Sequence, residues 1–167
     1  MSLRLMEKCF PSEYRKVEKE ADPEKKVYFV RESSGSIVLA MLRKVSRKDF
    51  LPEVRSSDGT CWLRSLESEV SCIVDFRDVE LNGVLCRYYI TRDQLENGVY
   101  YFLDLYMGQG RRMARLFVSG VERGNSYQRE PVHEDPFYDE LYPEHPLTQL
   151  RLLAKSLVYK ASAKGAA

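Results

Sequence analysis

The sequence contains few of the residues on which metal and thiol chemistry depend. Only two histidines and four cysteines occur among 167 residues. No two cysteines have the Cys-x-x-Cys spacing that is typical of zinc and redox motifs. Cys72 and Cys86 lie within apolar, strand-like patterns, where a free cysteine acts as a small hydrophobic residue. We therefore predict no metal site and no bound cofactor.

Long apolar runs and a surplus of one charge are also absent. The longest apolar run, residues 37–42, is far too short to cross a bilayer. The N-terminus lacks the apolar region of a signal peptide. Charged residues make up 31% of the chain, yet the net charge is only +1, which argues against a nucleic-acid binder. These observations predict a soluble, cytoplasmic protein with no membrane span.

Signatures of catalysis are missing as well. The sequence has no Gly-x-Ser-x-Gly, no Gly-x-Gly-x-x-Gly and no phosphate-binding loop. A nucleophilic cysteine (Cys61, Cys72 or Cys86) could pair with His133 only if the fold brought them together, and no spacing supports this pairing. We therefore favour a protein that is not an enzyme.

The stretch EPVHEDPFYDELYPEH, residues 130–145, holds both histidines and six carboxylates, but no Lys or Arg. These residue types can bind zinc or manganese. However, Pro131, Pro136 and Pro143 prevent the continuous helix that would place ligands on one face. We interpret the stretch as an acidic connector. Its large apolar residues leave recognition of a partner as the alternative.

The composition predicts one domain, because 44% hydrophobic and 11% aromatic residues suffice for a single core. We divide the chain into a β-rich core (1–129), the connector (130–146), a C-terminal helix packed on the same domain (147–161) and a disordered tail (162–167). The fold class is α+β and mainly antiparallel. Six to seven strands form a meander sheet or a barrel, with a short N-terminal helix and an amphipathic C-terminal helix.

The first third of the chain predicts one helix and two strands. Phe10, Tyr14, Val17 and Ala21 have the spacing of one helical face, which favours a helix over residues 12–21, with a strand as the alternative. Residues 26–31 and 36–43 read as strands on either side of a turn. The second of these strands is apolar on both faces, which indicates a central position in the sheet.

Two hairpins are expected between residues 69 and 122. Asn82-Gly83 separates two strand patterns and is a strong hairpin signal, which pairs Leu81 with Val84. A change in the parity of the apolar residues predicts a bulge near residues 77–78. In the second hairpin, a two-residue turn at Gln109-Gly110 is preferred to a three-residue turn, because it places Asp104 opposite Arg115.

One face of the second hairpin is apolar, whereas the other carries aromatic residues around the ion pair of Asp104 and Arg115. An aromatic face of this kind is expected to be covered by a helix, a ligand or a partner. The C-terminal helix has an apolar stripe that must be buried, and we predict that it docks on this aromatic face. The stripe consists of Leu147, Leu150, Leu153, Ala154, Leu157, Val158 and Ala161.

A meander followed by a C-terminal helix resembles, in architecture only, the pleckstrin-homology-like superfold and the calycin barrels. We predict a non-enzymatic interaction, scaffold or adaptor module with an unidentified protein partner, and self-association stays open. The predicted binding residues are Phe102, Tyr106, Phe117, Arg111, Arg112, Arg115, Phe137, Tyr138 and Tyr142. The alternative is a small-molecule-binding or catalytic barrel for a flat or anionic ligand, lined by Tyr88, Tyr101 and Tyr106. RNA binding by a Tyr/Arg sheet face is a third hypothesis, which the net charge disfavours.

Overall fold

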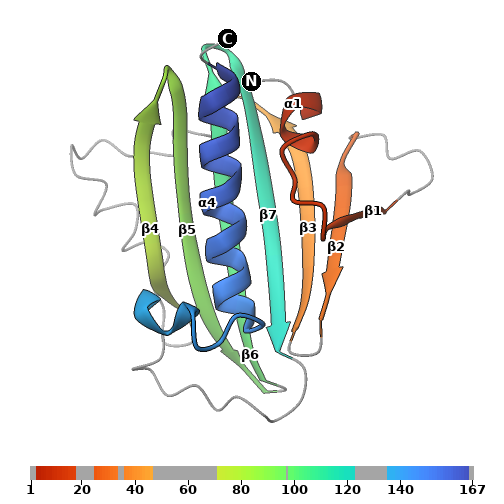
Figure 1. The fold of residues 1–167 in the computed structure, drawn as a ribbon, viewed down its shortest axis with the longest axis vertical. Helices are drawn as coiled ribbons and strands as arrows, with labels where there is room; N and C mark the ends of the chain where they lie inside the picture. The colour runs from red at the N-terminus through yellow and green to blue at the C-terminus, as the bar shows by residue number, and fades with distance from the viewer. Residues whose placement is uncertain are drawn as a thin grey trace.

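The computed structural model describes residues 3–17, 25–33, 36–46, 71–96, 98–122 and 135–165. Its centre is a seven-stranded antiparallel sheet, and a long C-terminal helix lies lengthwise over the middle strands of one face (Figure 1). The strands are β1 (Arg15–Val17), β2 (Val27–Glu32), β3 (Ser36–Val45), β4 (Ser71–Leu81), β5 (Val84–Leu95), β6 (Gly98–Gln109) and β7 (Arg112–Glu122). The helical elements are α1 (Leu3–Glu7), the 3-10 helix η2 (Pro136–Asp139) and α4 (Pro146–Gly165).

The strand order is β1-β2-β3-β7-β6-β5-β4. The chain therefore builds the sheet from both edges, and β3 meets β7 in the middle, which confirms the central position predicted for the strand at 36–43. The sheet is open, with β1 and β4 at opposite edges (Figure 1). The predicted α+β class with antiparallel strands is confirmed. The barrel alternative is wrong, and a single open sheet also departs from the barrels that the sequence pattern resembles.

Helix α4 packs on the sheet face that carries Tyr101, Leu103 and Leu105, and its leucines complete the main core there. The predicted docking on the opposite, aromatic face is wrong. The reason is desolvation: the face chosen by α4 is apolar along β6, whereas a helix on the other face would bury the guanidinium of Arg115, now 26% exposed, without any new partner.

The start of α4 approaches β7 closely at Gly120. A Cβ atom at this position would lie only 2.9 Å from the Cβ of Pro146. The glycine thus lets the first turn of the helix rest on the strand. The helix itself runs from Pro146 to Gly165, so residues 162–165, predicted as part of a disordered tail, are helical.

The N-terminal segment folds differently from its prediction. The helix is α1, at residues 3–7, while residues 15–17 form edge strand β1, paired with residues 28–30 of β2. Residues 18–21 of the predicted helix lie outside the described part of the chain. Phe10 stacks on Phe29 at a centroid distance of 3.8 Å. The apolar spacing that imitates a helix therefore comes from a turn that folds onto the sheet.

The β4–β5 hairpin has the predicted register, with Leu81 opposite Val84. Asn82 and Gly83 both have positive φ, 52° and 74°, as a type I′ turn requires. The predicted bulge near residues 77–78 is misplaced, because the register shifts between Ile73 and Asp75. This shift places Asp75 opposite Ile90, on the side of α4, where its carboxylate reaches Arg151.

The β6–β7 hairpin turns at Gly110-Arg111, one residue later than predicted, so Gln109 pairs with Arg112. Gly110 has a φ of 59°, which suits a turn with glycine at its first central position. The predicted Gln109-Gly110 turn would instead force Gln109 to a positive φ, which a residue with a long side chain disfavours. Because the register moves by two residues, every side chain keeps its predicted face.

Candidate functional site

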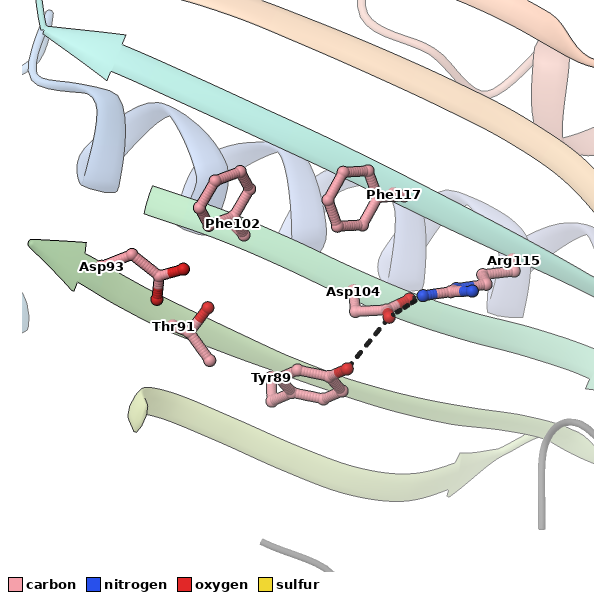
Figure 2. A pocket seen from close by; sticks show the side chains of 7 residues that line it. All are labelled: Tyr89, Thr91, Asp93, Phe102, Asp104, Arg115 and Phe117. Carbon is pink, nitrogen blue, oxygen red and sulfur yellow. Dashed lines mark hydrogen bonds and ion pairs between the residues drawn. The ribbon is translucent and has the colours of Figure 1, made fainter. Parts of the chain in front are cut away.

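The candidate site lies on the sheet face that points away from α4, which we call the outer face. Both described α-helices lie on the other side of the sheet (Figure 1). Alternation along three neighbouring strands directs one set of side chains to the outer face. The set consists of Tyr89, Thr91 and Asp93 from β5, Phe102 and Asp104 from β6, and Arg115 and Phe117 from β7. Figure 2 shows these seven residues together, with α4 behind the sheet.

At the centre of the outer face, Asp104 accepts hydrogen bonds from two side chains. Arg115 binds it in a bidentate manner, with Nε 2.8 Å from Oδ1. The Tyr89 hydroxyl donates to Oδ2 over 3.0 Å. Asp104 and Arg115 are not directly opposite each other, because Asp104 pairs with Phe117 and Arg115 with Tyr106. They are diagonal neighbours on adjacent strands, which is close enough for the predicted ion pair to form.

This network is largely removed from water on the side of the carboxylate. The Asp104 side chain is 3% exposed, whereas that of Arg115 is 26% exposed. The hydrogen bond to Asp104 raises the pKa of Arg115 above its usual value. Burial, together with the nearby Asp104 carboxylate, raises the pKa of Tyr89. The guanidinium and the phenol are therefore a cation and a neutral donor throughout the physiological range.

Aromatic rings surround the ion pair. Phe102 stacks on Phe117 at a centroid distance of 5.8 Å and on Tyr100 at 6.4 Å. The Arg115 guanidinium carbon lies 5.4 Å from the ring centroid of Tyr106 and 5.9 Å from that of Phe117, within the range of cation–π attraction. The outer face thus holds Arg115 both by a carboxylate and by two rings, while a second arginine of this face, Arg87, pairs with Asp78.

Two shallow depressions mark this surface. The β5–β7 depression, about 330 Å³, is lined by the seven residues of Figure 2. The β2–β3 depression, about 290 Å³, includes Tyr28, Leu39, Met41 and Phe117. Phe117 lines both depressions, so they adjoin each other along β7. Leu39 is 53% exposed.

The structure brings together only part of the predicted binding set. Phe102, Phe117 and Arg115 meet in the β5–β7 depression. Tyr106 is on the same face but buried, in a small cluster with Val45 and Met113. Arg111 is exposed at the hairpin turn, while the side chain of Arg112 is outside the described part of the structure.

The connector residues of the predicted set lie elsewhere. Phe137 is 75% exposed, and Tyr138 and Tyr142 are partly buried. They belong to the η2 region, on the side of α4 (Figure 1). The connector and the outer face are therefore two separate surfaces. His133 and residues 130–134 lie outside the described ranges.

Two acidic groups of the connector bind basic groups of the domain. Asp139 Oδ1 lies 3.0 Å from Nη1 of Arg151, a side chain that is 1% exposed and also lies 3.5 Å from Asp75. Glu144 pairs with Arg31 at 3.3 Å. A hydrogen bond from the Ser33 side chain, with help from Arg31, lowers the pKa of Glu144. These contacts attach the connector to its own domain.

The alternative predicted site, a tyrosine-lined cavity, does not form. Tyr88 and Tyr101 belong to the main core beneath α4, whereas Tyr106 is on the outer face. His145 is buried against Tyr101, with a centroid distance of 5.3 Å, and its Nδ1 accepts a hydrogen bond from the Leu147 amide. Within the described ranges, no group of three or more His, Cys, Asp or Glu is placed to hold a metal ion.

Sequence reasoning did not find several residues of the outer face. Tyr89, Thr91 and Asp93 were absent from the predicted set, although alternation along β5 places them beside Phe102 and Asp104. The exposed Leu39 was also missed. These residues share one surface because β3, β7, β6 and β5 lie side by side in that order. The sequence predicts hairpins between consecutive strands, but not this order.

Comparison with known proteins finds similarity in structure but not in sequence. No family model matches the chain, and no curated protein is significantly similar to it in sequence. One solved structure that it resembles is that of a protein of unknown function, PA94 from Pseudomonas aeruginosa. The TM-score is 0.43 at 7% sequence identity, over 80% of this chain and 93% of that chain. A similarity of this strength carries no argument about function. None of the described helices is long and apolar enough to cross a membrane.

Proposed function

We propose that this chain is a non-enzymatic protein-binding module, and that its outer face binds a segment of another protein. The observation that carries the proposal is the apolar surface formed by Leu39, Met41, Phe117 and Phe102 on the face away from both described α-helices. A contiguous apolar surface rimmed by polar residues is a common feature of protein–protein interaction sites.

The two adjoining depressions suit an extended partner better than a compact ligand. From β3 to β5 the surface spans three strand spacings, about 14 Å at 4.7–4.9 Å per step. Both depressions are shallow and lie on an open sheet, whereas small-molecule sites enclose most of their ligand. A protein segment can place successive side chains in both depressions.

The charges of the site specify the chemistry of the partner. Asp93 and Asp104 contribute two negative charges and Arg115 one positive charge to the β5–β7 depression, which leaves one net negative charge. The β2–β3 depression is lined mainly by apolar residues. Complementary surfaces match apolar area with apolar area and negative with positive potential. The partner segment therefore carries large apolar residues and a basic residue.

Site-specific photo-crosslinking tests this proposal. A benzophenone amino acid replaces Leu39 on the outer face in one protein, and Tyr159 in the other. Tyr159 is 76% exposed on α4 and provides the matched control. In cells that make the native protein, we expect the position 39 variant to crosslink to a discrete second protein, and the position 159 variant not to do so.

Binding between the purified proteins completes the test. The captured protein must bind the native chain in solution, and Leu39→Asp must weaken this binding by at least about tenfold, because it places a charge at the centre of an apolar contact. Equal crosslinking at both positions, or crosslinks only between copies of this chain, would refute the proposal.

A further inference from the structure

The β5–β7 depression contains two sets of one carboxylate and one neighbouring aromatic ring, and only one set has its arginine. In the first, Arg115 donates to Asp104 and lies over the ring of Phe117. In the second, Asp93 lies on β5 two residues beyond Thr91, and Thr91 is directly opposite Phe102. Both sets line the same depression (Figure 2).

Asp93 is the unpaired member of this arrangement. Its Oδ1 atom is buried and has no hydrogen-bond partner within the described part of the chain. A buried carboxylate oxygen without a donor is destabilising, because it has lost water without gaining a bond. Such an atom calls for a donor that the described part of the chain does not supply, and Asp93 lines a depression from which a donor can approach its carboxylate.

We propose that Asp93, with the ring of Phe102 and the hydroxyl of Thr91, binds the guanidinium group of an arginine in the protein partner. A guanidinium donates two parallel hydrogen bonds to a carboxylate while its flat face stacks on a ring. The chain makes the same kind of carboxylate–arginine–ring contact internally, at Asp104, Arg115 and Phe117. Directly opposite Asp93 lies Tyr100, and Phe102 is its diagonal neighbour. This inference rests on the proposed function, since it identifies the basic residue of the partner segment.

The net charge of the depression agrees with a cation. Asp104 is already neutralised by Arg115, so the remaining negative charge belongs to Asp93. An arriving guanidinium therefore meets an attractive carboxylate at one end of the depression. Arg115 lies near the other end, and its position selects the orientation of the partner side chain.

An NMR titration of the isotope-labelled full chain tests the site without knowledge of the partner. The probe is N-acetylarginine amide, and N-acetylcitrulline amide is its uncharged control of the same shape. We expect the arginine compound to shift the backbone amide signals of Thr91, Asp93 and Phe102, and the citrulline compound to leave them unchanged. N-acetyllysine amide should bind more weakly, because an ammonium group cannot stack and bind both carboxylate oxygens at once.

Two variants complete the design. Asp93→Asn should weaken binding of the arginine compound by about three- to tenfold, in the range of a partly buried pair assisted by a ring. Glu80→Gln removes the same charge from an exposed position on β4 and should leave the affinity unchanged. Asp93→Asn should not lower the thermal midpoint, because the buried Oδ1 has no described partner to lose.

The outcomes separate the two proposals. Equal affinity of Asp93→Asn and the native chain, or equal affinity for arginine and lysine, would overturn the assignment of a guanidinium site. If the arginine compound binds at Asp93 but position 39 captures no other protein, the cation site stands and the protein-binding function fails. If a partner is captured but its binding is insensitive to Asp93→Asn, the function stands and this site falls.

Discussion

Each face of the sheet has an arginine that is bound by carboxylates, Arg151 on the α4 side and Arg115 on the outer face, and the two differ in how far they are exposed to solvent. On the face of α4, Arg151 is 1% exposed and joins Asp75 of β4 to Asp139 of η2. On the outer face, Arg115 is 26% exposed, and its Asp104 is in the deeper position. One arginine is therefore enclosed in the interior, and the other forms part of a surface.

This difference in exposure indicates that the two faces contribute differently to stability and to binding. The Arg151 cluster ties α4 and the preceding η2 to β4, which is far from both in sequence. Its loss leaves two carboxylates with little access to water. The Arg115 network joins neighbouring strands that the ladder already holds. We therefore expect substitutions on the α4 side to lower the unfolding free energy most. Substitutions on the outer face should have smaller effects on stability and larger effects on partner binding.

The largest effect is expected from Arg151→Leu. Removing one partner of a buried ion pair leaves an uncompensated charge and should cost about 3–5 kcal/mol of unfolding free energy. Arg115→Leu should cost less, about 1–3 kcal/mol, because Tyr89 still donates to Asp104. Urea unfolding followed by circular dichroism measures both, and equal losses would contradict the contrast between the faces.

A pair of leucines probes the same contrast without charge. Leu150 of α4 is fully buried against the sheet, and Leu150→Ala should lower the unfolding free energy by about 2–5 kcal/mol through lost burial and a cavity. Leu39→Ala, on the exposed outer face, should change it by no more than about 0.5 kcal/mol. A large loss at Leu39 would mean that the outer face is part of the stabilising core.

A smaller effect is expected where the helix meets the sheet. Gly120→Ala introduces a Cβ 2.9 Å from the Cβ of Pro146, and the rigid proline ring limits the adjustment. Overpacking of this kind should cost about 1–3 kcal/mol. Ala114→Gly, at a buried position of the same strand, is a comparison in which a Cβ is removed instead. A neutral Gly120→Ala would show that α4 shifts freely on β7.

The smallest effect concerns pH. Because the folded pKa of Glu144 is lowered, its contribution to stability is present above the unfolded value of about 4.5 and is lost as pH falls through the folded value. Glu144→Gln should thus lower the unfolding free energy at pH 7 by less than about 1 kcal/mol, as for an exposed pair, and converge with the native chain at lower pH. Urea unfolding from pH 3 to 7 measures this difference.

The matched control is Glu140→Gln, which removes the same charge from an exposed position in the connector. Its difference from the native chain should not vary in the same way with pH. A Glu144→Gln difference that grows on acidification would contradict the sign of the shift.

The sequence predicted correctly those features that depend on residues close together in the chain. Asn82-Gly83 specified its turn because asparagine and glycine accept positive φ. The stripe of α4 and the alternation of β6 followed from their own periods, 3.6 and 2. The turn predicted at Gln109-Gly110 was wrong by one residue, because the dipeptide does not determine whether glycine takes the first or the second central position of the turn. The spacing at Phe10 and Tyr14 misled because a turn packed on a sheet can copy a helical period.

By itself, the sequence determined the class of the fold, most of its strands, the hairpin faces and the amphipathic helix, because these depend on neighbours within about ten residues. It also identified the ion pair of Asp104 and Arg115. Tertiary structure alone decided which face α4 covers, since this choice depends on the cost of burying Arg115 under a helix. It also decided that β3 meets β7, and only this pairing brings Leu39, Phe117 and Asp93 onto one surface.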